Sequence, residues 1–255
     1  MKRSEFAAVS FFIIMSICIP CAAGTYDGGS GSEEVPYRIS DANDLKELSE
    51  TPSDWSRNFV ITGNIEMAGV AIDPIGLWET AFTGVFDGQG YSINNLTVNL
   101  PDADNAALFS VVKGSSVIKN LSLVNATVAG KRYSAGLVSL NESGTIINCN
   151  VSGTVNTAVT TGDPMEINSA GGLVAINYGT ISNSSSSVSV TLNSICSTQA
   201  GGLAGGNSGI IENCSSSGAV GTSGFTATGG GLVGNNDGDI IGSYASGNVT
   251  VSAED

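Results

Sequence analysis

The sequence predicts an all-β protein in which short strands wind into a parallel β-helix, a β-solenoid of about six to seven coils with a short N-terminal capping helix. A unit beginning AGGL or GGGL recurs, and its leucine returns at intervals of 36, 30 and 29 residues. Periods of this length are typical of stacked repeats. Each unit contains short strand-like stretches bounded by Gly, Asn or Ser, and none has a helical pattern. The repeated leucines are Leu137, Leu173, Leu203 and Leu232.

A second column of residues extends the repeat toward the N-terminus. The pattern Ile-x-Asn followed by a small or apolar residue occurs five times, and a sixth copy has Ser243 where Asn is expected. Asparagine tolerates the left-handed backbone region, and stacked amides can hydrogen-bond from coil to coil. We therefore predict that these asparagines form one corner of the coil; the alternative is scattered turn residues without a ladder. They are Asn95, Asn120, Asn148, Asn183 and Asn213.

Residues 1–23 are predicted to be a secretory signal peptide. Lys2 and Arg3 precede the apolar run 7–20, which is too short to span a bilayer, and cleavage is expected after Ala23 or Gly24. A lipid anchor at Cys21 and an uncleaved anchor are the alternatives. The mature chain is thus expected to have no membrane span and to be secreted or held at the cell surface.

The segments between the signal peptide and the repeats are expected to form a lead-in and a cap at the N-terminal end of the β-helix. Residues 24–36 are rich in Gly, Ser and Glu and predict a flexible lead-in. Residues 37–81 are expected to contain an N-terminal cap and an entering strand, with a helix over 41–50 that begins at Ser40 as N-cap. We interpret this helix as a cover for the open end of the solenoid; a recognition helix is the alternative.

The β-helix itself is expected over 82–255, with the clearest repeats from 134. The stretches Gly202-Leu203-Ala204-Gly205 and Gly231-Leu232-Val233-Gly234 resemble the GLUG motif, whereas the copies at 136–139 and 172–175 lack its last Gly. This resemblance implies a β-helix, usually right-handed. It also implies a secreted or surface bacterial protein, adhesin-like or akin to the non-catalytic parts of some immunoglobulin-A-cleaving peptidases.

The charge pattern restricts the possible partners. The formal net charge is −14 and the pI about 4.1, no lysine or arginine follows Arg132, and eight acidic residues do. Nucleic acid is excluded as a partner, because neutralising phosphates requires Lys or Arg. An extracellular glycan, or a surface protein of a host or neighbouring cell, fits this acidic chain better.

Three cysteines remain once the signal is removed. Cys149 and Cys214 occupy equivalent positions with Ser184 between them, so two coil spacings of ~4.8 Å separate them, beyond the ~7 Å reach of a disulfide. They are predicted to be small buried residues. Cys196 lies in an insertion and is expected to be exposed, and a cysteine nucleophile would lack a histidine partner, because the chain has none.

Other candidate sites are weaker. Asn235, Asp237 and Asp239 loosely resemble a calcium loop, but the distal Glu is missing, and a solvated turn is the favoured interpretation, so no metal or cofactor is predicted. Trp55 and Trp78 are interpreted as covering apolar surface at the cap, with sugar stacking as the alternative.

These observations favour a non-enzymatic extracellular or cell-surface module for adhesion, scaffolding or carbohydrate binding. One alternative is a polysaccharide lyase or hydrolase of the β-helix type, for which Asp87, Asp102, Asp104 and Arg132 are the nearest candidates, although no spacing supports it. The other is a spacer fragment of a larger surface protein.

Overall fold

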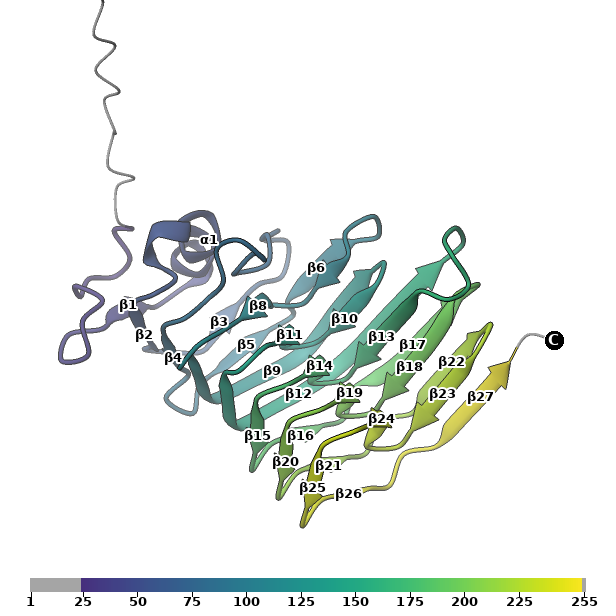
Figure 1. Cartoon of the computed structure of the whole chain (residues 1–255). Helices are drawn as coiled ribbons and strands as arrows, with labels where there is room; N and C mark the ends of the chain where they lie inside the picture. Colours follow the sequence, from purple (N-terminus) through teal and green to yellow (C-terminus); the bar gives the residue numbers. More distant parts are fainter. Residues whose placement is uncertain (1–23, 254–255) are drawn as a thin grey trace, which may run out of the picture.

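The computed structural model describes residues 24–253, and these wind into a β-solenoid of about seven turns, as predicted. Every strand pairing is parallel, and strands from successive coils stack along the axis from the N-terminal to the C-terminal end (Figure 1). The strands form one 17-stranded sheet and two five-stranded sheets. The predicted signal peptide, 1–23, lies outside the described residues.

The large sheet contains β1 (Tyr37–Ile39), β2 (Asn58–Ile61), β3 (Ile65–Glu66), β4 (Val85–Asp87), β5 (Ser92–Asn94), β6 (Thr97–Leu100), β9 (Val117–Gly130), β12 (Thr145–Val159), β15 (Thr180–Ser182), β16 (Ser185–Ser186), β17 (Ser189–Ser194), β20 (Ile210–Glu212), β21 (Ser215–Ser216), β22 (Val220–Gly224), β25 (Asp239–Ile241), β26 (Tyr244–Ala245) and β27 (Val249–Ala253). The second sheet contains β7 (Asn105–Ala106), β10 (Tyr133–Ala135), β13 (Ile167–Gly171), β18 (Ser197–Gly201) and β23 (Ala227–Gly230). The third contains β8 (Phe109–Val112), β11 (Val138–Asn141), β14 (Val174–Asn177), β19 (Ala204–Asn207) and β24 (Val233–Asn236).

The helix α1 (Ala42–Glu50) lies between β1 and β2 and is followed by the 3₁₀ helix η1 (Pro52–Asp54). Its N-cap is Asp41 and not Ser40, because the Asp41 carboxylate accepts the amides of Asn43 and Asp44 at 2.8 and 3.1 Å. Ser40 instead donates its amide and hydroxyl to the Asp44 carboxylate. Among the residues that the structure describes, no helix is long and apolar enough to cross a membrane.

The coils begin earlier than the sequence suggested. β1 pairs with β2, and β2 with β4, so the solenoid starts near Tyr37 and not at residue 82. Residues 24–36, expected to be a flexible lead-in, are tied to this first coil; the amides of Thr25 and Tyr26 donate to the Glu47 carboxylate of α1. The N-terminal cap and the first coils are therefore one packed unit.

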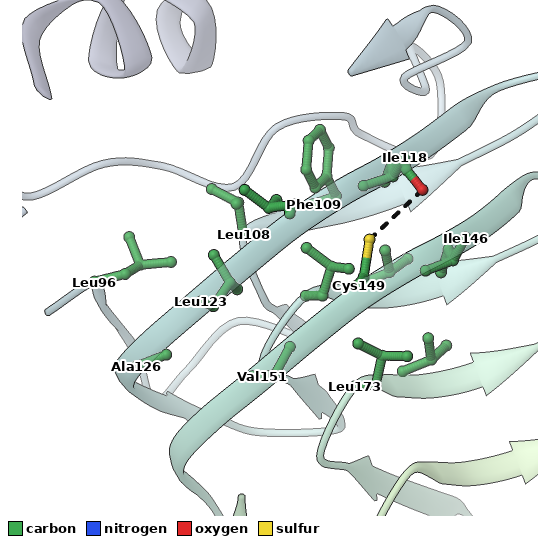
Figure 2. Packing of buried hydrophobic residues seen from close by; sticks show 14 of the residues in the cluster. Leu96, Leu108, Phe109, Ile118, Leu123, Ala126, Ile146, Cys149, Val151 and Leu173 are labelled. Atoms are coloured by element: carbon green, nitrogen blue, oxygen red, sulfur yellow. Dashed lines mark hydrogen bonds between the residues drawn. The ribbon is translucent and has the colours of Figure 1, made fainter. Parts of the chain in front are cut away.

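The core is a set of inward-pointing columns. In one, aromatic residues at the N-terminal end give way to isoleucines, and each residue is in register with the next: Tyr37, Phe59, Phe86, Ile118, Ile146, Ile181, Ile211 and Ile240. The repeat leucines form a second column in which the amide of Leu137 donates to the carbonyl of Leu173, and Leu173 to Leu203. Figure 2 shows such packing around Cys149, whose sulfur points into the core, 3.6 Å from the carbonyl oxygen of Ile118.

Four of the predicted corner asparagines stack along one edge. Asn120, Asn148, Asn183 and Asn213 all have φ between 49° and 55°, in the left-handed region, and their flanking residues are in register. The fifth, Asn95, belongs to another column, where it accepts a hydrogen bond from Asn125 at 2.6 Å. The last member of the corner is Gly242 and not Ser243, because Glu212 pairs with Ile241.

Candidate functional site

A groove runs along the solenoid where the sheet of β10, β13 and β18 meets the sheet of β11, β14, β19 and β24. Its volume is about 350 Å³, which is within the range of ligand pockets. It combines three aromatic side chains with acidic and amide groups. Its lining residues are Trp78, Tyr133, Leu140, Glu142, Ile167, Ile176, Tyr178, Gln199, Gly206, Asn207, Ser208, Asn235 and Asp237.

The floor of the groove is one outward-facing column of the third sheet. Leu140, Ile176, Gly206 and Asn235 are in register on β11, β14, β19 and β24. A Cβ on Gly206 would lie 3.0 Å from Cδ1 of Ile176 and 3.1 Å from Oε1 of Gln199. The glycine therefore keeps the floor low at this coil, and the floor changes from apolar to polar toward the C-terminal end.

One wall is formed by the residues that follow these strands. Glu142, Tyr178, Ser208 and Asp237 occupy equivalent positions in four successive coils, and the last three donate their amides to the preceding coil at 2.7 to 2.8 Å. Coils of stacked strands are spaced ~4.8 Å apart. Tyr178 is 53% exposed, so its ring is available to a ligand along the groove.

This wall stands on a hydrogen-bonded column of asparagine side chains that the sequence analysis missed. Asn141 donates Nδ2–H to Oδ1 of Asn177, Asn177 to Asn207, and Asn207 to Asn236, each at 2.7 Å. Each of the four also donates to the carbonyl of a glycine two or three residues later. The signal was present in the sequence, because each of these asparagines is the fourth residue after a repeat leucine. We call this column the asparagine ladder.

The two tryptophans have different roles. Trp55 is 2% exposed and donates Nε1–H to the carbonyl of Leu48, so it packs within the cap. Trp78 is 56% exposed at the N-terminal end of the groove. The Lys113 ammonium lies 3.9 Å from the centroid of the Trp78 ring and donates to the Trp78 carbonyl at 3.2 Å, which positions the indole.

The second wall includes Tyr133, Ile167 and Gln199. The Arg132 guanidinium lies 5.2 Å from the centroid of the Tyr133 ring, and its Nε is 3.4 Å from the carbonyl of Ile167. Lys113 and Arg132 thus each contact an aromatic lining residue, Trp78 and Tyr133 respectively, toward the N-terminal end of the groove. The lining residues themselves include two acidic side chains, Glu142 and Asp237, and no lysine or arginine.

The suggested calcium residues lie at the far end of the groove. Asn235 donates Nδ2–H to the Asp237 carboxylate at 3.2 Å, and Asp239 begins β25. Within residues 24–253, no group of three or more His, Cys, Asp or Glu side chains is arranged to hold a metal ion. The geometry here is that of a hydrogen-bonded turn.

Of the candidate catalytic residues, Arg132 contacts the groove through Tyr133, but the carboxylates of Asp87, Asp102 and Asp104 do not line it. Asp87 ends β4 in the large sheet, where its buried carboxylate accepts from Asn120 and Gln89 and lies 3.3 Å from the Lys119 ammonium. Asp102 and Asp104 lie between β6 and β7, and the Asp104 carbonyl accepts the amide of Tyr133 at 2.6 Å. The contacts of Asp87 are those of a structural ion pair.

The three cysteines in the described part of the chain, Cys149, Cys196 and Cys214, are free and buried. Cys196, expected to be exposed, has no exposed surface. Its sulfur lies beside Gly162, where an added Cβ would be only 2.9 Å away, so the loop around Gly162 packs against this side chain. Burial raises the pKa of the Cys149 thiol to about 12 and also raises that of Cys214, so both are neutral thiols at physiological pH.

The chain carries a GLUG motif at residues 197–221, within the region where the resemblance was noted. It is 35% identical over 141 residues to halomucin from Haloquadratum walsbyi, a match covering 52% of this chain and 2% of that protein. It is 31% identical over 136 residues to a "putative Gly-rich membrane protein" of Evansella cellulosilytica, covering 51% of this chain and 16% of that one. The chain therefore spans a small fraction of these relatives.

Solved structures share the fold. A "putative immunoglobulin A1 protease" from Bacteroides ovatus superposes with a TM-score of 0.72 and 25% identity, covering 89% of this chain and 71% of that one. A structure named IgA1 protease gives a TM-score of 0.53 at 18% identity, covering 84% of this chain and 20% of that one. The second likeness concerns the fold alone.

Proposed function

We propose that this chain is a non-enzymatic β-helix module, secreted or displayed at the cell surface, that binds an extended glycan in the groove. The observation that carries the proposal is the placement of Trp78, Tyr133 and Tyr178 around one open channel with Glu142 and Asp237. Aromatic rings supply flat apolar surface with a polar edge, which suits the faces of sugar rings. Carboxylate and amide groups supply the acceptors and donors that sugar hydroxyls require.

The repeating geometry favours a polymer over a single sugar. Equivalent wall positions recur at every coil, ~4.8 Å apart, and solenoids commonly use such long surfaces for extended ligands. The charge favours a neutral glycan, because the groove beyond Lys113 and Arg132 contains carboxylates and no cations. Polyanionic glycans would be repelled there.

A binding experiment tests the proposal. Residues 24–255 are screened on a glycan array, and hits are measured by titration calorimetry. Tyr178→Ala and Trp78→Ala are each expected to weaken binding at least about tenfold, the equivalent of about 1.4 kcal/mol. Tyr244→Ala is the matched control, because Tyr244 is also exposed but lies on β26, outside the groove. Silence on the array, or equal binding by all variants, would contradict the proposal.

Because the chain is similar in fold to structures named as proteases, the binding experiment is accompanied by an assay for enzymatic cleavage. The purified chain is incubated with immunoglobulin A1 and with a panel of polysaccharides, and fragments and new reducing ends are measured. We expect no turnover. Cleavage abolished by a substitution of Asp87, Asp102, Asp104 or Arg132 would instead support the enzymatic alternative.

A spacer role is the second candidate, and the lengths of the relatives favour it. The matched segments cover 2% and 16% of those proteins, so a coil of this type can be a small part of a long chain. A module that binds no glycan yet unfolds cooperatively would support the spacer role.

A further inference from the structure

Asp54 is a buried carboxylate without a cationic partner among residues 24–253. It lies in η1 and is 3% exposed. No lysine or arginine nitrogen of that part of the chain comes within 4.0 Å of its oxygens. Burying a carboxylate is costly unless hydrogen bonds and an opposite charge compensate it. Its surroundings should therefore supply a positive group.

The group that reaches it is the backbone nitrogen of Gly24. This nitrogen donates to Oδ2 of Asp54 at 2.8 Å, and the hydroxyl of the buried Tyr26 donates to the same oxygen at 3.1 Å. Burial and the charge of Asp54 raise the pKa of Tyr26 above its ordinary value, so its hydroxyl stays a neutral donor. The next amides, of Thr25 and Tyr26, donate to Glu47 at 2.7 and 3.0 Å.

Position 24 is closely fitted. A Cβ there would lie 2.4 Å from Cζ of the Tyr26 ring and 2.7 Å from its hydroxyl oxygen. Only a glycine brings its nitrogen to Asp54 while the Tyr26 ring stays in place.

We propose that the chain matures by hydrolysis of the Ala23–Gly24 peptide bond, and that the α-ammonium of Gly24 is the counter-ion of Asp54. Water adds across the bond: its hydroxyl goes to the carbonyl carbon of Ala23, which leaves as a carboxylate, and the Gly24 nitrogen is protonated. A secretory signal peptidase catalyses this step. The inference rests on the proposed export and not on glycan binding, so a negative result on the glycan array would not contradict it.

The cut turns a hydrogen bond in which only the Asp54 acceptor is charged into an ion pair in which the Gly24 donor is charged as well. Processing then fastens residues 24–26 onto α1 and η1, at the end of the solenoid where the first coil begins. Cleavage after Gly24 would instead move the ammonium to Thr25 and remove the group that contacts Asp54. A lipidated Cys21 would leave the Gly24 nitrogen an uncharged amide.

The first experiment locates the cut. The full chain is expressed in a secreting bacterial host, and the exported protein is measured by intact mass and N-terminal sequencing. A chain beginning at Gly24 is expected. A chain that begins at Thr25, keeps a lipidated Cys21 or retains residues 1–23 would overturn the proposal.

The second experiment tests the ion pair. Residues 24–255 with a free Gly24 amine are compared with the N-acetylated form, which keeps the N–H and removes the charge, by urea unfolding. Acetylation is expected to lower the folding equilibrium constant roughly tenfold, which corresponds to about 1.4 kcal/mol. In Asp54→Asn the difference between the two forms should vanish, whereas in Glu47→Gln, the matched control, it should persist.

An acetylation effect of equal size in wild type and Asp54→Asn would overturn the ion pair. Should Asp54→Asn not fold, the wild-type pair decides alone, because equal unfolding midpoints of the free and acetylated chains would also overturn it.

Discussion

The two halves of the solenoid are held together by different means. The N-terminal coils are filled with rings, and Phe59, Phe82, Phe86 and Phe109 pack with centroid separations of 5.1 to 6.5 Å. The C-terminal coils have no aromatic core residue and place aliphatic side chains, cysteine or serine at the inward positions. All three ion pairs among residues 24–253 lie between Asp27 and Lys119. The same coil path is thus stabilised by large apolar contacts at one end and by hydrogen bonds between coils at the other.

This difference shows that a coil can be filled by small inward side chains when its asparagine side chains are hydrogen-bonded from one coil to the next. The asparagine ladder begins at Asn141, after the last aromatic core residue, and continues to Asn236. Amide groups in a buried chain strengthen one another, so the ladder offsets the smaller apolar burial of those coils.

The largest expected effect comes from removing a ring. Phe86→Ala should reduce the free energy of unfolding by about 3–5 kcal/mol, because the buried ring leaves a cavity between Phe59 and Phe109. Urea unfolding followed by Trp55 fluorescence measures it. Cys214→Ser is the matched C-terminal change and should cost far less, because Ser184 already occupies the equivalent position in the preceding coil. Similar losses for both would remove the distinction between the halves.

Breaking the ladder should have the next largest effect. Asn177→Ala removes the acceptor of Asn141 and the donor to Asn207, and leaving buried polar groups unpaired costs about 1–3 kcal/mol each. Thermal unfolding followed by circular dichroism checks this prediction. Asn193→Ala is the control, because Asn193 is exposed and its side chain accepts one hydrogen bond, from the Ser223 hydroxyl. A ladder variant as stable as this control would show that the amides contribute nothing.

The corner asparagines should matter less and in a different way. Asn183→Ala must hold a left-handed backbone with φ of 49°, at a cost of about 1–2 kcal/mol. Asn183→Gly should be nearly neutral, because glycine adopts that region freely. The pair is compared by urea midpoints. A glycine variant as unstable as the alanine variant would mean that the amide, and not the backbone, is what the corner requires.

The smallest expected effect on stability appears only at acidic pH and concerns Asp87. Burial acts to raise the pKa of Asp87, but hydrogen bonds from Asn120 and Gln89 and the Lys119 ammonium outweigh it and leave the pKa below the usual 3.8. A lowered native pKa stabilises the fold above the unfolded value, and this stabilisation is lost as the pH falls through the native one. Unfolding between about pH 5 and 2 should therefore depend less steeply on pH in Asp87→Asn. An unchanged slope would contradict this role.

The repeat columns explain how much was predictable from sequence. Period, strand-like stretches and the GLUG resemblance predicted the stacked fold, because side chains in such a coil repeat at fixed offsets. The start of the solenoid was missed because β1 and β2 lack the Ile-x-Asn pattern and have Tyr37 and Phe59 in the inward position. Asn95 was assigned to the wrong column because a similar pattern occurs at two corners, and only strand register separates them. The sequence did not show which of Trp55 and Trp78 is buried and which is exposed, because local sequence does not encode which ring packs against the helix α1.

The last coils are nearly equal in length, so a chain of this kind can gain or lose whole coils during evolution. The leucines at 173, 203 and 232 are 30 and 29 residues apart, and each coil meets its neighbours through nearly interchangeable upper and lower surfaces. A duplication or loss of one such unit would shift everything beyond it along the axis by a single step and leave every contact type intact. The length of this rod can thus be altered by recombination in whole units, without redesigning its interior.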